Sequence, residues 1–130
     1  MENNWSEAKL RLWGRLMAET RLLEEGRLAV AFVTRAALSE TGSRREDAEG
    51  FVEQLRRLVG VRVALLLREE EKDGKLFTKA SLRSSGNDSV RDVAAQFGGG
   101  GHKNAAGATI AMDAEMTLDA LLPHIRSIWN

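Results

Sequence analysis

Four consecutive glycines, Gly98–Gly101, stand directly before His102 and Lys103, and this segment is the best suited to chemistry. Glycine loses more backbone entropy on folding than any other residue, so a run of four indicates a structural demand. Without side chains in the way, several amide groups can turn toward one ligand and form an anion-binding concavity. A helical turn beginning near His102 is expected to add the positive end of its dipole to the same anion-binding site. A flexible linker would more often mix glycine with Ser, Asn or Asp, so we favour a phosphate site.

The residues that follow the glycines extend this prediction. His102 and Lys103 can donate side-chain hydrogen bonds to a phosphate, and the expected concavity runs as far as Asn104. The candidate phosphate-binding residues in this segment are Gly99, Gly100, Gly101, His102, Lys103 and Asn104.

Arg83 is the second candidate, because it lies where a predicted strand ends and a loop begins. Ligands of open α/β sheets gather at the carboxyl ends of strands. The planar guanidinium of arginine also matches the geometry of phosphate oxygens. Taken alone, Arg83 would be interpreted as a solvated surface arginine, and the glycine run is what favours a role in binding.

The composition limits the partners of such a site. The chain has 130 residues, the size of one domain, with 19 basic and 19 acidic side chains. A protein that coats long duplex DNA usually carries a basic surplus, so contact with nucleic acid is expected to be local and short. Aromatic residues make up only 5%, which argues against a broad stacking platform for single strands.

The sequence offers no metal site of its own. Cysteine is absent, which excludes disulfides and thiolate ligands, and the six aspartates are scattered along the chain. No apolar run is long enough to span a bilayer, and the first residues lack the pattern of a signal peptide, so we expect a cytoplasmic protein without membrane contact.

Helical and strand patterns alternate, which predicts an α/β fold with a mixed sheet of about four to five strands covered by helices. Strands are expected at residues 28–33, 61–68, 75–84 and 108–112. Helices are expected at residues 4–24, 43–59, 90–97 and 117–129, with a loose segment at 36–42. Asn4 with Glu7, and Ser43 with Glu46, are expected to cap the first two helices, and Pro123 predicts a bend or a late start for the last.

Asp73-Gly74 predicts a hairpin that joins two of these strands. Alternation along the second strand places Leu82 and Ala80 on one face and Arg83, Ser81 and Lys79 on the other. Arg83 is therefore expected to point away from the Leu82 face.

The glycine segment resembles the signature of the DHHA1 domain, which closes the DHH family of phosphoesterases. A second motif of that family is matched upstream by Ser81-Leu82-Arg83-Ser84, and the helix that precedes the loop is matched by Asp92-Val93-Ala94. The resemblance extends from near Leu10 to near Ile128. The matching segment is Phe97-Gly98-Gly99-Gly100-Gly101-His102-Lys103-Asn104-Ala105-Ala106-Gly107.

This resemblance implies a function as well as a fold. The most similar branch contains nanoRNases and oligoribonucleases, which also act on 3′-phosphoadenosine 5′-phosphate and include exopolyphosphatase-related proteins. In these enzymes an N-terminal DHH domain binds two metal ions, usually manganese, and the DHHA1 domain holds the substrate across a cleft. Carried over by motif, Arg83 and Ser84 would contact the substrate phosphate or terminal base, whereas Gly99, Gly100, Gly101 and His102 would hold phosphate near the metals.

The Asp-His-His triplet of the family is absent here, so we expect residues 1–130 to be a substrate-binding fragment of a longer two-domain enzyme, inactive by itself. Its expected partners are the DHH domain, a short RNA or phosphorylated nucleotide, and a second copy in a homodimer. Two alternatives remain open at this stage. One is a stand-alone nucleic-acid-binding or dimerisation module, similar to domains of alanyl-tRNA synthetases. The other is part of a hydrolase of cyclic dinucleotides or polyphosphate.

Overall fold

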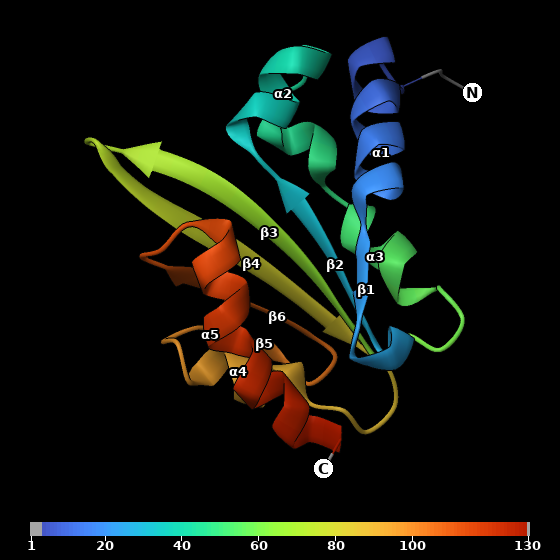
Figure 1. Ribbon diagram of the computed structural model, residues 1–130, viewed down its shortest axis with the longest axis vertical. Coiled ribbons are helices and arrows are strands. Elements are labelled where there is room, and N and C mark those ends of the chain that lie inside the picture. The colour runs from blue at the N-terminus through green and yellow to red at the C-terminus, as the bar shows by residue number, and fades with distance from the viewer. Residues whose placement is uncertain (1–3, 130) are drawn as a thin grey trace.

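The computed structural model describes residues 4–129, which form a six-stranded mixed sheet with helices on both faces (Figure 1). The strand order is β1-β2-β3-β4-β6-β5, and β2 runs parallel to β3 whereas the other neighbours are antiparallel. The strands are β1 Arg21–Leu23, β2 Leu28–Val33, β3 Val63–Lys72, β4 Lys75–Ser84, β5 Gly100–His102 and β6 Ala105–Ile110. The helices are α1 Glu7–Glu19, α2 Arg35–Thr41, α3 Phe51–Arg56, α4 Val90–Ala95 and α5 Ala114–Arg126, with short 3₁₀ turns η1 Glu24–Gly26, η2 Arg45–Ala48 and η3 Ser127–Trp129.

Two hydrophobic cores lie on opposite faces of the sheet. On one face, α4 and α5 pack on the strands, with Leu65 and Leu82 against Leu121. On the other face, α1 and α3 pack on β2 and β3, with Leu12 and Phe51 among the buried side chains. The alternation of apolar side chains on β3 and β4 serves both cores, because successive residues point to opposite faces.

The second face is covered only in part. The helices α1, α2 and α3 belong to the half of the molecule built on β1, β2 and β3, and no residue of β6 enters their core. On β6 the residues that point to this side, Ala105, Gly107 and Thr109, are all at least partly exposed, whereas Ala106 and Ala108 are buried on the other. We call this side of β4, β6 and β5 the open face.

The predicted α/β class, the mixed sheet and the hairpin at Asp73-Gly74 are confirmed. The sheet has six strands rather than four or five, because the three-residue strands β1 and β5 form its two edges. None of the helices within residues 4–129 has the length and apolar character needed to cross a bilayer.

The predicted first helix, residues 4–24, is too long. It ends at Glu19, and the chain then turns into β1, which pairs with β2. Its start is capped by Ser6, whose hydroxyl accepts a hydrogen bond from the Lys9 amide at 3.0 Å, rather than by Asn4 with Glu7.

The region around residues 36–59 also differs from its prediction. The segment predicted to be loose forms α2, because the Thr34 hydroxyl caps its start by accepting from the Ala37 amide. The helix predicted at 43–59 is divided into η2 and α3, because Gly50 adopts a φ of 88°. The cap predicted from Ser43 and Glu46 is made instead by Asp47, whose carboxylate accepts from the Arg44 amide.

The last two predicted elements begin early. β6 starts at Ala105 rather than at 108, and α5 starts at Ala114, where the Asp113 side chain accepts from the Met116 amide. The helix α5 continues through Pro123 instead of starting late. Proline lacks the amide that would bond the preceding turn, so the helix loses one hydrogen bond there.

Candidate phosphate-binding site

Arg83 on β4 and His102 on β5 lie in one row across the open face. The register pairs Arg83 with Ala105 of β6, and Ala105 with His102. Residues paired in this way point to the same side, and neighbouring strands are about 4.8 Å apart, so roughly 10 Å separates the two backbones. Ala105 is the residue of β6 between them. The register thus places Arg83 and His102 on the same side of the sheet, and binding of an anion by these residues stays a prediction.

A pocket of about 410 Å³ opens beside this row. The next row across the sheet consists of Ser81, Gly107 and Gly100. Because these residues have small side chains or none, they leave space above the sheet. Lys79 and Arg68 stand at the far side of the pocket. The strands thus supply a shallow pocket whose lining includes two basic side chains, and Arg83 and His102 lie in the row beside it.

The first two glycines of the run are explained by the end of α4. The Gly98 amide donates to the Ala95 carbonyl at 3.2 Å, and the Gly99 amide donates to the Ala94 carbonyl at 2.9 Å. This pair of bonds closes the helix and needs a left-handed residue, which Gly98 provides with a φ of 77°. The Gly99 amide therefore points at the helix, and a contact from it to phosphate stays a prediction.

Sterics explain two further glycine positions. A Cβ atom on Gly99 would overlap the Gly107 carbonyl oxygen and come within 2.7 Å of the Ala108 Cβ. A Cβ atom on Gly101 would come within 2.6 Å of the Ala105 carbonyl oxygen. Gly99 and Gly101 thus allow the strand β5 to approach β6 closely, and this approach is what brings His102 into the row of Arg83.

The helical turn expected near His102 is wrong. The chain forms a tight hairpin there, in which β5 turns through Lys103 and Asn104 into β6. Because β5 is an edge strand, half of its backbone groups point away from β6. The polar groups offered to an anion are therefore edge amides, without the positive end of a helix.

Ser84, which is buried, and Asn104, which is partly buried, form a network that joins the two predicted motifs. The Ser84 hydroxyl is fully buried and donates to the Asp88 carbonyl at 2.6 Å. The Asn104 side-chain amide donates to the Ser84 hydroxyl at 2.9 Å and also lies within bonding distance of the Gly86 and Asp88 carbonyls. The Asn104 carbonyl in turn accepts from the Ser84 amide at 3.1 Å. These contacts hold the His102 hairpin against the end of β4, and direct contact of either side chain with substrate stays a prediction.

Replacing Asn104 with aspartate is expected to destabilise the fold. A carboxylate would face carbonyl oxygens without a proton to donate, and an unsatisfied buried group costs about 1–3 kcal/mol. The free energy of unfolding, measured by urea denaturation, tests this. Asn87→Asp is the matched control, because Asn87 is exposed and, among the described residues, its side-chain oxygen accepts from the Lys103 ammonium alone, at 3.2 Å. Equal stability of the two variants would contradict the role of the network.

The Arg83 guanidinium is held in place by its neighbours. Its Nε donates to the Glu53 carboxylate at 2.8 Å, and its Nη1 donates to the Leu82 carbonyl at 3.0 Å. Glu53 also pairs with Arg56 at 2.8 Å, so this part of the site has two cations for one anion. The arginine side chain keeps 26% of its surface exposed, and its Nη2 atom makes no hydrogen bond within residues 4–129.

The Lys103 side chain reaches Asn87 and lies at the outer end of the hairpin, exposed. Lys79 and Arg68 were missed as site residues from the sequence. The signal for Lys79 was present, because alternation had already placed it on the same face as Arg83. Arg68 could not be recognised, because its position depends on the pairing of β3 with β4.

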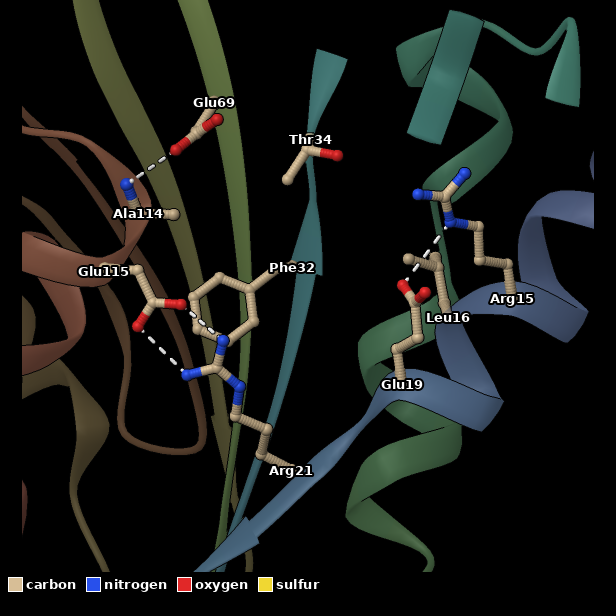
Figure 2. Close-up of a pocket in the computed structure, with 9 residues that line it drawn as sticks. All are labelled: Arg15, Leu16, Glu19, Arg21, Phe32, Thr34, Glu69, Ala114 and Glu115. Atoms are coloured by element: carbon tan, nitrogen blue, oxygen red, sulfur yellow. Dashed lines mark hydrogen bonds and ion pairs between the residues drawn. The ribbon is translucent and has the colours of Figure 1, made fainter. Parts of the chain in front are cut away.

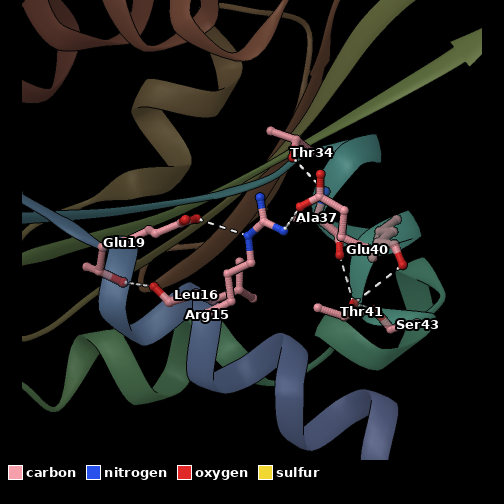
Figure 3. Close-up of polar contacts among 10 residues, drawn as sticks. Arg15, Leu16, Glu19, Thr34, Ala37, Glu40, Thr41 and Ser43 are labelled. Atoms are coloured by element: carbon pink, nitrogen blue, oxygen red, sulfur yellow. Dashed lines mark hydrogen bonds and ion pairs between the residues drawn. The ribbon is translucent and has the colours of Figure 1, made fainter.

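A second pocket, of about 470 Å³, lies between α1, β2 and the start of α5 (Figure 2). Its two arginines are paired with carboxylates: Arg21 with Glu115, and Arg15 with Glu40 and Glu19 (Figure 3). The hydrogen bond from Arg21 lowers the pKa of Glu115, so this carboxylate stays ionised. Neutralised in this way, the pocket is a poorer place for phosphate than the open face.

Within residues 4–129, no three His, Asp or Glu side chains converge in a way that could hold a metal ion.

Comparisons with known proteins identify the family of the chain. Residues 25–128 match the model of the DHHA1 domain. Over 92 residues the chain is 36% identical to the bifunctional oligoribonuclease and PAP phosphatase NrnA of Thermus thermophilus, an alignment that covers 70% of this chain and 27% of that protein.

Solved structures show the same fold. An exopolyphosphatase-related protein from Bacteroides fragilis superposes with a TM-score of 0.82 at 28% identity, over 98% of this chain and 38% of the other. The pGpG-specific phosphodiesterase PggH from Vibrio cholerae superposes with a TM-score of 0.59 at 16% identity, over 92% of this chain and 39% of the other. The chain thus spans between a quarter and two fifths of the length of these relatives.

The resemblance predicted from the glycine–histidine segment and the Ser-Leu-Arg-Ser strand is confirmed. The family match covers most of the chain, and the chain belongs to the DHHA1 domain family.

Proposed function

We propose that this chain holds the phosphorylated substrate of a DHH-family phosphoesterase, with a short oligoribonucleotide or 3′-phosphoadenosine 5′-phosphate as that substrate. The observation that carries the proposal is the row Arg83–Ala105–His102, in which the strand register places two hydrogen-bond donors on the same side of the sheet, one on each side of Ala105. The similarity to an oligoribonuclease and PAP phosphatase supports the choice of substrate.

In this proposal a DHH domain faces the open face and completes the active site. That domain would bind two metal ions, manganese by family resemblance, which supply the activated water for hydrolysis. The contribution of this chain is to bind and orient the phosphate. Arg83 would neutralise charge on one side of it, and His102 with the edge amides of β5 would donate hydrogen bonds from the other.

His102→Ala tests this role in a polypeptide that joins the chain to a DHH domain. Loss of one donor to the charge that develops on phosphate is expected to lower kcat by about 10²-fold. Metal content, measured by elemental analysis, should stay unchanged because in this proposal the DHH domain supplies the metal ligands. His124→Gln is the matched control, since His124 packs edge-on against Phe97 on the opposite face, with ring centroids 5.2 Å apart.

Two results would contradict the proposal. One is loss of metal from the His102→Ala variant with phosphate binding intact. The other is hydrolysis of the substrate by the 130-residue chain alone. A cytoplasmic location and homodimer formation stay predictions from the sequence.

A further inference from the structure

The open face carries a second group of basic side chains, apart from Arg83 and His102. Lys79 on β4 pairs in register with Arg68 on β3 and with Thr109 on β6, and all three line the 410 Å³ pocket. Along β4, Lys79 lies two residues closer to the tip of the β3–β4 hairpin than Ser81, and four residues closer than Arg83. The proposed binding of phosphate by Arg83 and His102 does not involve these three residues.

The charges of this corner do not cancel. Its acidic member is Glu70, which pairs with Arg68 at 2.7 Å and with Arg45 at 2.8 Å. Burial raises the pKa of Glu70, but the hydrogen bond from Arg68 and the charges of Arg68, Lys79 and Arg45 together bring it below its usual value. Three cations, Arg68, Arg45 and Lys79, therefore lie near a single carboxylate, and two of them form ion pairs with it. Within residues 4–129 the Lys79 ammonium makes no ion pair or hydrogen bond, so it is the cation that is available to a ligand.

The sheet surface between Lys79 and Arg83 carries small side chains. Four residues of β4 separate Lys79 from Arg83, which is roughly 13 Å at about 3.3 Å per residue. Ser81 and Gly107 occupy the row between them, so no large side chain blocks the path. Successive phosphates of a stacked strand advance about 3.4 Å, and more when the strand is extended, so the span corresponds to roughly two to four nucleotides.

We propose that Lys79 and Arg68 form a second anion subsite, which binds a phosphodiester of a short single-stranded oligoribonucleotide whose terminal phosphate lies between Arg83 and His102. The inference rests on the proposed function and narrows its substrate class. Phosphates on a single nucleoside are too close together to reach both groups, whereas a chain of a few nucleotides reaches them. Lys79 therefore distinguishes an oligonucleotide from a mononucleotide.

The test measures binding of three ligands to the 130-residue chain by calorimetry: inorganic phosphate, 3′-phosphoadenosine 5′-phosphate and a 5′-phosphorylated tetraribonucleotide. Lys79→Ala is expected to weaken tetranucleotide binding about 5- to 10-fold and to leave the other two affinities unchanged. The slope of log affinity against log salt concentration should fall by about 0.7 for the tetranucleotide, the amount expected for one lost phosphate contact on a single strand. Lys79→Arg should restore both quantities.

Two further variants make the outcomes distinguishable. Lys72→Ala removes the same charge from the exposed hairpin end beyond Lys79, and it should bind all three ligands like the unmodified chain. If Lys79→Ala behaves like Lys72→Ala while Arg83→Ala weakens every ligand, the second subsite is wrong and the proposed function stands. If Arg83→Ala weakens none of the ligands, or the unmodified chain binds none, the proposed function itself is wrong.

Discussion

Replacing Arg83 with alanine is expected to weaken phosphate binding by about 10- to 150-fold, the equivalent of about 1.5–3 kcal/mol for hydrogen bonds to a charged group. The guanidinium is anchored by Glu53 of α3 and by the Leu82 carbonyl, which fix its position at the end of β4. Because the anchoring leaves one terminal nitrogen free, the arginine is preorganised to meet the ligand with little further loss of side-chain entropy. Calorimetric titration of the chain with inorganic phosphate and with 3′-phosphoadenosine 5′-phosphate measures the change.

Arg83→Lys separates charge from geometry in the same assay. Lysine keeps the positive charge but lacks the planar guanidinium group. We therefore expect the Arg83→Lys variant to bind phosphate more tightly than Arg83→Ala and less tightly than the unmodified chain. Arg57→Ala is a suitable control, because Arg57 is an exposed cation that follows α3. Similar losses for Arg57→Ala and Arg83→Ala would mean that general charge, rather than the row with His102, binds the anion.

Replacing Gly99 with alanine is expected to damage the fold and the site together. The new methyl group would overlap the Gly107 carbonyl oxygen and the backbone of Ala108, neither of which can move without displacing β6. Forced contacts of this kind typically cost about 1–3 kcal/mol, which corresponds to a decrease in Tm on the order of 10 °C for a domain of this size. Thermal denaturation followed by circular dichroism measures it. Phosphate binding should be lost as well, because β5 would no longer lie beside β6.

Gly100→Ala is the matched control within the same glycine run. A Cβ atom on Gly100 meets nothing within 4 Å, and the residue does not adopt a positive φ. Its Tm should therefore stay within a few degrees of the unmodified chain. If Gly99→Ala were as stable as Gly100→Ala, the close approach of β5 to β6 would not be the reason for the glycine run.

The parts of the fold that followed from the sequence are those with strong local signals. The strand β2 is a short, continuous apolar run, and the hairpin of β3 and β4 has alternating apolar residues joined by Asp73-Gly74. The edge strands β1 and β5 have only three residues each and no buried side chain, so they show no alternation of apolar and polar residues from which a strand could be predicted. The order of the strands depends on pairings between distant segments, which local pattern does not encode.

The candidate site could be proposed from the sequence as a set of residues, but its arrangement could not be predicted. Residue types and motif resemblance indicated Arg83, His102 and the glycines as binding residues. The sequence did not show that Gly99 and Gly101 act through their closeness to β6, or that the Gly99 amide is used to end α4. The expected helix dipole at His102 was wrong because the segment forms an edge strand, and a glycine run is compatible with either structure.

The central claim, that an anion binds between Arg83 and His102, is tested most directly by following the amide signals of the ¹⁵N-labelled chain while phosphate is added. Saturable shifts centred on Gly100, Gly101 and His102, together with the Nε–H signal of Arg83, are the expected result. Shifts centred instead on Arg21 and Glu115 in the other pocket, or the absence of any saturable shift, would contradict the claim.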